Sequence, residues 1–208
     1  MSIIINGTHI PFQQKNVDLN GYYGRMTELP ENIGTLRNIT FLNLHDNLLT
    51  RLPSSIGDLQ ELTELTVSLN HLKSLPVSIG NLSKLKKLNL SINDLKRIPV
   101  SIKNLKNLRT LDLRRNKLKG LPKSIGQLRN LRELDLSENV DLLELPESIG
   151  NLKRLKKLNL TDTNLTYLPA SMSNLTKLEE LEINGESIRL PLVPNMYGTF
   201  SVHDQIPF

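Results

Sequence analysis

Leucine and isoleucine recur along the chain with two different spacings inside each repeating unit. In one unit Leu111 and Leu113 stand two residues apart, and Leu118 follows five residues later. A two-residue spacing places both side chains on one face of a short β-strand. Ile125 and Leu128 are three apart, which suits one turn of 3₁₀- or α-helix facing the same core. Each unit is therefore predicted to be a short strand, a turn and a short helical segment.

The unit repeats almost without interruption along the chain. Each copy carries a Leu-Pro or Ile-Pro pair, and the successive prolines at 30, 53, 76, 99, 122, 146 and 169 are 23, 23, 23, 23, 24 and 23 residues apart. Such a repeat predicts a solenoid in which neighbouring coils bury one another's apolar faces. We expect eight coils with parallel strands near 17–19, 42–44, 65–67, 88–90, 111–113, 134–136, 158–160 and 181–183. The extra residue before Pro146 predicts a bulge at Val140 and Asp141.

Two polar residue types also recur in register with the leucines. An asparagine follows most strands, where its amide can satisfy buried backbone groups at the turn. The expected ladder is Asn47, Asn70, Asn93, Asn116 and Asn139, followed by Thr163 and then by Glu186 at a solvated edge. A Ser-Ile-Gly sequence follows the prolines, and its serine is expected to start the helical turn as an N-cap.

The order of residues in one unit resembles the L-x-x-L-x-L-x-x-N-x-L pattern of the leucine-rich-repeat family, and the resemblance covers roughly residues 17 to 191. It implies an α/β fold, a leucine-rich-repeat solenoid (horseshoe) with a parallel β-sheet on its concave side and short 3₁₀, helical or extended segments on its convex side. The L-P-x-x-I-G-x-L linker resembles the intracellular Ras-associated and Scribble-like repeats and those of bacterial effectors. The first resemblance implies a small GTPase or a signalling complex as partner, the second a host protein, and the sequence does not choose between them.

One structural domain with capped ends is expected. Residues 1–16 form an N-terminal capping hairpin with an Asn6-Gly7 type I′ turn, residues 17–189 form the solenoid, and residues 190–208 form a C-terminal cap or tail. The Gly21–Gly24 segment is either a capping turn or a contact loop. Residues expected to end the ladder and cover the last core layer are Pro191, Pro194, Met196, Tyr197, Phe200 and Phe208.

Several classes of function are disfavoured by composition. The chain has no cysteine, which removes disulfides, thiolate nucleophiles and cysteine-based zinc sites and favours a cytoplasmic location; for a secreted effector this would be the host cytoplasm. No signal peptide or transmembrane stretch is predicted. The four histidines lack metal-ligand spacing, and there is no P-loop. We expect no catalytic residues, no metal, no cofactor and a monomeric protein that is not an enzyme.

The distribution of charge indicates the kind of partner. The chain carries +5, yet the positions predicted to face the concave side hold ten acids and four bases, a net charge of −6. A nucleic-acid reader would line this face with lysine and arginine, so a basic protein is the expected partner. The basic convex side is left with two interpretations. It either keeps the solenoid soluble or binds nucleic acid or anionic lipid.

The candidate protein-binding residues come from the predicted concave rows. Three of them are apolar and follow one another along the N-terminal half, where they are either an interface anchor or a coincidence. The full set is Phe41, His45, Asp46, Glu64, Leu69, Ile92, Asp112, Arg114, Arg115, Glu133, Asp135, Glu138, Asp162 and Glu182.

Overall fold

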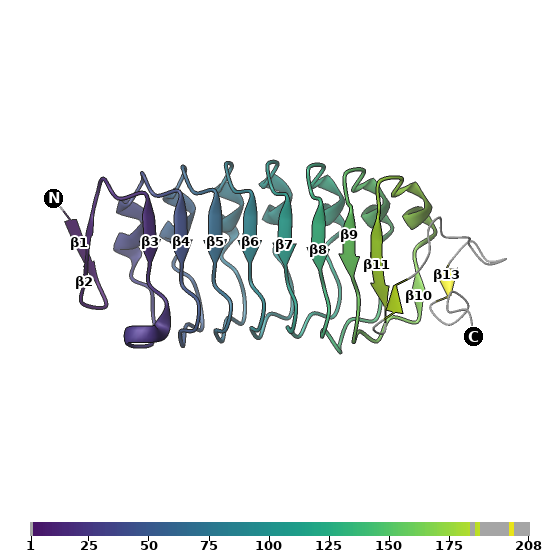
Figure 1. Ribbon diagram of the computed structural model, residues 1–208, viewed down its shortest axis with the longest axis horizontal. Helices are drawn as coiled ribbons and strands as arrows, with labels where there is room; N and C mark the ends of the chain where they lie inside the picture. The colour runs from purple at the N-terminus through teal and green to yellow at the C-terminus, as the bar shows by residue number, and fades with distance from the viewer. Residues whose placement is uncertain (1, 184–185, 188–199, 202–208) are drawn as a thin grey trace.

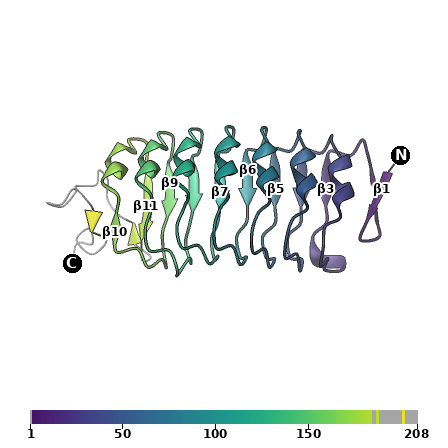
Figure 2. The ribbon, with the colours of Figure 1, turned by 180° about the vertical axis from the view of Figure 1, so that it is seen from behind.

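The computed structural model describes residues 2–183, 186–187 and 200–201, and it has the layered arrangement of a solenoid. A row of parallel strands forms one side, and a row of 3₁₀-helices forms the other (Figures 1 and 2). The strands are β1 (Ser2–Ile5), β2 (Thr8–Pro11), β3 (Asn16–Asp18), β4 (Phe41–Asn43), β5 (Glu64–Thr66), β6 (Lys87–Asn89), β7 (Thr110–Asp112), β8 (Glu133–Asp135), β9 (Lys157–Asn159), β10 (Tyr167–Leu168), β11 (Glu180–Ile183), β12 (Glu186–Ser187) and β13 (Phe200–Ser201). The helices are η1 (Gly21–Tyr23), η2 (Glu31–Thr35), η3 (Ser54–Asp58), η4 (Val77–Asn81), η5 (Val100–Asn104), η6 (Lys123–Gln127), η7 (Glu147–Asn151) and η8 (Ala170–Asn174).

The predicted set of eight parallel strands is confirmed, with each strand beginning one residue earlier than expected. β3 to β9 and β11 pair in chain order, and β12 adds one antiparallel strand at the end. The earlier start arises because the residue before the first strand leucine also pairs, as Phe41 does with Glu64. Interstrand bonding continues beyond the assigned strand, where the Leu44 N–H donates to the Thr66 carbonyl over 2.8 Å.

The core is a continuous aliphatic column between the sheet and the helices. Leu111 in β7, Leu113 just after it, Ile125 in η6 and Leu128 just after that helix have at most 1% of their surface exposed. The same four positions are buried in the neighbouring coils. Because each coil buries its leucines against the next, stability is shared between neighbours along the row.

The asparagine ladder is confirmed and shows why this residue recurs. The Asn116 Nδ2 donates to the carbonyls of Leu90 and Leu113 over 3.0 Å each. Its Oδ1 accepts from the Leu95 N–H, also at 3.0 Å. One side chain thus satisfies backbone groups in two consecutive coils. Within the described part of the chain, the Thr163 side chain makes a single bond, from its hydroxyl to the Leu160 carbonyl at 2.7 Å.

The prediction that serine caps the helical turn is wrong. Proline occupies the N-cap position of η2 to η8, and where these helices carry the serine it is their second residue, as Ser101 is in η5. The hydroxyls of Ser55, Ser78, Ser101, Ser124 and Ser148 are buried and have no hydrogen-bond partner among the described residues. What the position requires is small size, because a Cβ built on Gly80 would lie 2.5 Å from the Ser101 carbonyl oxygen and 2.8 Å from the Ser101 Cβ.

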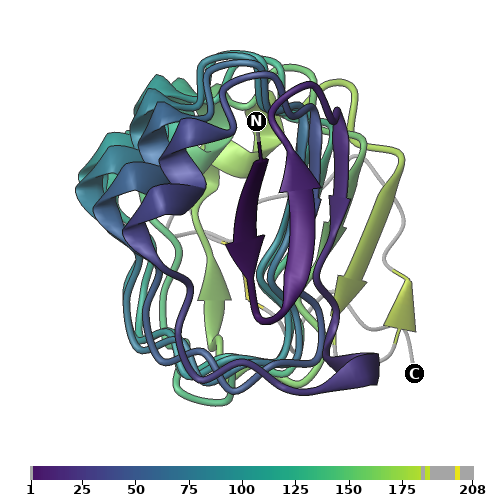
Figure 3. The same cartoon turned by 90° about the vertical axis from the view of Figure 1, so that its left-hand side faces the viewer.

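The N-terminal hairpin covers the first coil. β1 and β2 pair antiparallel around Asn6 and Gly7, whose φ angles of 47° and 76° fit the predicted type I′ turn. In the end view the hairpin lies across the solenoid between the sheet and the helices (Figure 3), and Ile5 and Ile10 are each only 1% exposed. Behind it η1 begins after Asn20, whose side chain accepts from the Tyr22 N–H, as suits a capping turn.

The last coils depart from the regular repeat in two places. The extra residue forms the predicted turn at Val140 and Asp141, closed by the Leu142 N–H donating to the Asn139 carbonyl at 3.0 Å. The backbone of β13 pairs antiparallel with β10. The other residues expected to cap this end lie outside the described residues, as does the side chain of Glu186. No helix among the described residues is long and apolar enough to cross a membrane.

Candidate protein-binding surface

The first residue of each strand forms a row of largely alternating charge across the concave face. Lys87 bonds to Glu64 at 3.2 Å, and Lys157 bonds to Glu180 at 2.8 Å. The hydrogen bond from Lys157 to Glu180 raises the pKa of Lys157. Glu133 accepts a bond from the Thr110 hydroxyl at 3.3 Å and makes no ion pair with a described residue. This row therefore neutralises most of its own charge.

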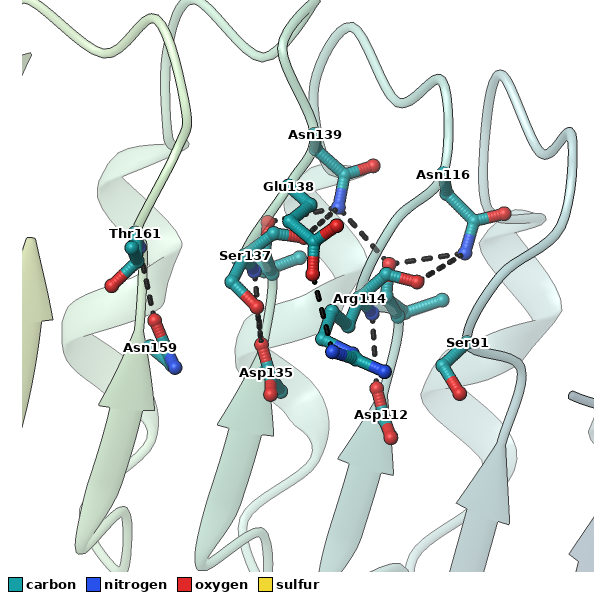
Figure 4. A network of polar contacts seen from close by, with 12 residues as sticks. Ser91, Asp112, Arg114, Asn116, Asp135, Ser137, Glu138, Asn139, Asn159 and Thr161 are labelled. Carbon is teal, nitrogen blue, oxygen red and sulfur yellow. Dashed lines mark hydrogen bonds and ion pairs between the residues drawn. The ribbon is translucent and has the colours of Figure 1, made fainter. Parts of the chain in front are cut away.

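The last residue of each strand forms a second row that is mostly aspartate and asparagine. The Asp112 Oδ1 accepts from the Arg114 N–H at 3.0 Å, and the Asp135 Oδ1 accepts from the Ser137 N–H at 2.9 Å (Figure 4). The Asn159 Oδ1 accepts from the Thr161 N–H at 2.9 Å in the same way. Both residue types close this turn with one carbonyl-type oxygen.

Sequence reasoning missed this structural role, although a signal was present in the chain. Aspartate and asparagine exchange freely at this position, and what they share is the side-chain oxygen rather than the charge. It follows that asparagine at Asp112 or Asp135 would close the turn equally well. The negative charge at these two coils is a separate property that the turn does not require.

These charges gather over the C-terminal half of the sheet, in a shallow hollow of about 360 Å³ on β7, β8, β9 and β11. Among the described residues of its lining the only base is Lys157, which is bonded to Glu180. The other ionisable residues of the lining are the acids Asp112, Glu133, Asp135 and Glu182. The hollow thus carries four negative charges that no described lysine or arginine pairs with at close range.

The environment of Asp112 disfavours the negative charge of its carboxylate. Burial raises the pKa of Asp112, the bond from the Arg114 N–H lowers it, and the nearby Asp135 carboxylate raises it again, with a net rise. A buried carboxylate next to a like charge favours its neutral form. A cationic group entering the hollow would relieve both effects, so the site is electrostatically suited to lysine or arginine.

Several of the other predicted binding residues are engaged within the protein. Asp46 pairs with Arg25 at 2.8 Å, and Glu138 pairs with Arg114 at 3.2 Å (Figure 4). The His45 Nδ1 lies 2.8 Å from the Ser68 hydroxyl. The structure therefore does not bring these side chains into the acidic hollow.

A ridge of strained residues runs along the strand-to-helix turns. Six non-glycine residues there have φ between 52° and 56°, a left-handed conformation that is unfavourable for bulky side chains. They are Asp46, Leu69, Ile92, Arg115, Glu138 and Asp162. Leu69 is 41% exposed and sits one coil from Ile92, whereas Phe41 lies at the start of its strand, in the row of Glu64. Of the three predicted apolar residues, Leu69 and Ile92 therefore lie on this ridge, and Phe41 is set apart from them.

Within the described residues no three histidine, aspartate or glutamate side chains are grouped so that they would hold a metal ion. The acidic hollow presents carboxylates spread over four strands rather than converging on one point. This arrangement presents several negative charges along the sheet rather than a single binding point.

Comparison with known proteins supports the repeat assignment. Residues 77–144 match the family described as leucine-rich repeat region. No curated protein matches the chain significantly in sequence. Among solved structures, a leucine-rich-repeat protein of Leptospira interrogans is similar at 35% identity with a TM-score of 0.65, covering 81% of this chain and 48% of its own.

Two further solved structures widen the range of relatives. The leucine-rich repeat domain of the type III effector XopL has 27% identity and a TM-score of 0.69, covering 83% of this chain and 69% of its own. The ectodomain of an Arabidopsis thaliana receptor kinase, GASSHO1/SCHENGEN3, in complex with CASPARIAN STRIP INTEGRITY FACTOR 2 has 31% identity and a TM-score of 0.66, covering 84% of this chain and 26% of its own. The chain thus spans about half the length of the Leptospira protein and a smaller part of the receptor.

Proposed function

This chain is a leucine-rich-repeat protein, a member of a family whose members are typically non-enzymatic interaction scaffolds, and we propose that its acidic hollow binds a basic segment of a protein partner. The observation that carries the proposal is the set of unpaired acids over β7 to β11. Complementary charge steers such an encounter and selects against acidic competitors. The plant receptor complex supports the use of this kind of solenoid for holding a separate ligand.

The strained apolar pair supplies a second contact for the same partner. Leu69 and Ile92 adopt a left-handed backbone that costs about 1–2 kcal/mol per residue. The same strain recurs at six equivalent turns, so what distinguishes Leu69 and Ile92 is that their side chains are apolar and at least partly exposed. An extended segment with a basic end over β7 to β9 and an apolar residue near β5 and β6 would meet both contacts.

The type III effector among the similar structures supports a host protein as one possible class of partner. The resemblance of the linker to Ras-associated repeats supports an intracellular signalling protein as the other. With either class of partner, the proposed location is a cytoplasm, the protein's own or that of a host. In each case the recognised feature is the same, a lysine- or arginine-rich segment.

The test uses substitutions that remove charge and keep the turns. Asp112→Asn, Asp135→Asn and Glu182→Gln are combined in one variant, since asparagine already closes the same turn at Asn159. The wild-type chain and this variant are used to capture proteins from lysate, and the affinity of each retained protein is measured by calorimetry. We expect a basic protein whose affinity falls at least about tenfold in the variant, because buried complementary charges are worth several kcal/mol.

A matched control removes three acids elsewhere on the surface, using Glu28→Gln, Asp58→Asn and Asp141→Asn, all exposed. The control should bind as the wild type does. If both variants lose the partner equally, net charge rather than the hollow governs binding. If neither loses it, the acidic hollow is not the binding surface.

The raised pKa of Asp112 adds a pH signature to this proposal. Its cause is burial, with a contribution from Asp135. Affinity for a basic partner should be complete above this pKa and should fall as pH is lowered through it, starting at a higher pH than for an exposed aspartate. Calorimetry from about pH 7 down to about pH 4 measures this. The Asp112→Asn variant should show a flatter profile, and an unchanged profile would exclude Asp112 from the interface.

A further inference from the structure

The loops that join each helix to the next strand line one edge of the solenoid, the upper edge in Figure 1. Four consecutive loops, residues 82–86, 105–109, 128–132 and 152–156, contain nine bases and no acid. The bases are Lys84, Lys86, Lys106, Arg109, Arg129, Arg132, Lys153, Arg154 and Lys156. The loops on either side, residues 59–63 and 175–179, each contain an acid. We call these nine residues the basic edge.

The fold aims these side chains outward. Each loop has two leucines, such as Leu128 and Leu131, and both are fully buried. The remaining positions face solvent, as Arg129 and Arg132 do. Because equivalent positions recur in every coil, bases such as Arg109 and Arg132 stack in rows along the edge with the strand spacing of about 4.8 Å.

Most of this charge is not neutralised within the protein. Lys84 pairs with Glu61 and Lys156 pairs with Glu179, each at 2.6 Å, at the two ends of the edge. The other seven bases make no ion pair with any described residue. Because these charges are close together and not compensated, the middle of the edge is a strongly positive strip that attracts anions.

Shallow hollows along the strip suit single phosphate groups. Arg129, Lys153 and Arg154 line a shallow hollow of about 570 Å³ together with amide side chains. The Arg154 guanidinium is oriented by the Asn130 Oδ1, which accepts from it at 2.6 Å. Lys106 lines an adjoining hollow with Arg129 and Asn130. Guanidinium and ammonium groups beside amides are the donors that bind phosphate oxygens.

We propose that the basic edge binds the surface of a bilayer containing anionic phospholipid. A row of bases along a projecting edge meets a planar surface along its whole length, and clusters of four to eight lysines and arginines are typical of such contacts. A single-stranded nucleic acid would call for aromatic stacking partners, and the four loops contain none. Docking on this edge leaves the concave face free, and the acids there are repelled by the same bilayer. This inference does not depend on the proposed function.

The test is co-sedimentation of the whole chain with vesicles of phosphatidylcholine, alone or mixed with phosphatidylserine, at physiological ionic strength. The variant Arg109→Glu with Arg132→Glu reverses two exposed bases of the strip. The control Lys73→Glu with Lys96→Glu makes the same change in net charge at exposed lysines in the strand-to-helix turns, at the other edge. Circular dichroism verifies that both variants fold.

We expect binding only to vesicles with phosphatidylserine. The edge variant should bind at least about 25-fold more weakly, since each base near an anionic surface contributes roughly fivefold, while the control stays close to the wild type. Absence of wild-type binding, or equal loss in both variants, would overturn the proposal. Tighter binding to duplex DNA or RNA than to vesicles, lost in the edge variant, would overturn the bilayer as partner and assign the strip to nucleic acid. Capture of the basic protein partner is a separate readout that the edge variant should leave unchanged.

Discussion

Two polar residues recur through the coils, the asparagine of the strand-to-helix turns and the serine of the 3₁₀-helices. The asparagines and the serine hydroxyls are both buried, yet different properties keep the two residues there. Asn116 bonds to backbone groups of neighbouring coils through both ends of its amide. The Ser101 hydroxyl has no partner among the described residues, and the Cβ atom of Ser101 packs against Gly80. A buried polar residue that recurs therefore marks either a set of hydrogen bonds or a limit on size, and only the contacts separate the two.

The largest effect should come from breaking the asparagine ladder. Asn116→Leu leaves the N–H of Leu95 without a partner, and it removes one of the two amide bonds to each of the carbonyls of Leu90 and Leu113, which also accept from Asn93 and Asn139. Since a buried orphan costs about 1–3 kcal/mol and each lost bond about 1 kcal/mol, we expect a loss of about 3–5 kcal/mol in the free energy of unfolding. Urea unfolding followed by circular dichroism measures it, because the chain has no tryptophan. Asn116→Thr, which copies Thr163, should lose less. A loss below about 1 kcal/mol in Asn116→Leu would mean that the amide bonds are not what holds the turn.

The second effect comes from crowding the serine ladder. Gly80→Ala places a methyl group 2.5 Å from the Ser101 carbonyl oxygen, so the two coils must move apart. Overpacking of this kind costs about 1–3 kcal/mol. Gly120→Ala is the control, because nothing lies within 4 Å of its Cβ position. It should be neutral or stabilising. Equal behaviour of the two variants in thermal unfolding would contradict the close contact between coils.

A smaller effect is expected at the turn that the asparagine ladder imposes. Arg115 precedes Asn116 and has a φ of 52°. Asparagine tolerates this conformation better than arginine, so Arg115→Asn should stabilise the chain by about 1 kcal/mol. Lys119→Asn, at an exposed position outside the left-handed ridge, is the comparison. If the two substitutions shift the unfolding midpoint equally, the strain at Arg115 is not released by asparagine.

The smallest effect separates size from hydrogen bonding in the serine ladder. Ser101→Ala keeps the Cβ that packs on Gly80 and removes a buried hydroxyl without a partner. We expect the free energy of unfolding of Ser101→Ala to be unchanged or to rise by up to about 1 kcal/mol. Ser171→Ala should instead destabilise, since that hydroxyl donates to the Glu147 carbonyl at 2.6 Å. A loss in Ser101→Ala comparable to that in Ser171→Ala would place the two serines in the same class.

The sequence determined the repeat and everything that depends on its period. Apolar residues at fixed positions, such as Leu111 and Leu113, can be buried only if the coils stack, so the sheet, the helices and the asparagine ladder were predictable. The Asn6-Gly7 turn was equally predictable, because few residue pairs accept two positive φ angles. These features are set by local spacing and local backbone preference.

The role of each repeated polar residue, and which charges lack an ion-pair partner, became clear only from the packing of the coils. Asp46 and Asp112 are both aspartates at positions predicted to face the concave side, yet Asp46 is paired with Arg25 and Asp112 lies in a hollow beside Asp135. The serine position was likewise interpreted by residue type, whereas its distance to the neighbouring coil fixes its role. The physical reason is that hydrogen bonding, burial and charge pairing depend on side chains about 23 residues away in sequence and about 5 Å away in space, which the period implies but the residue letters do not specify.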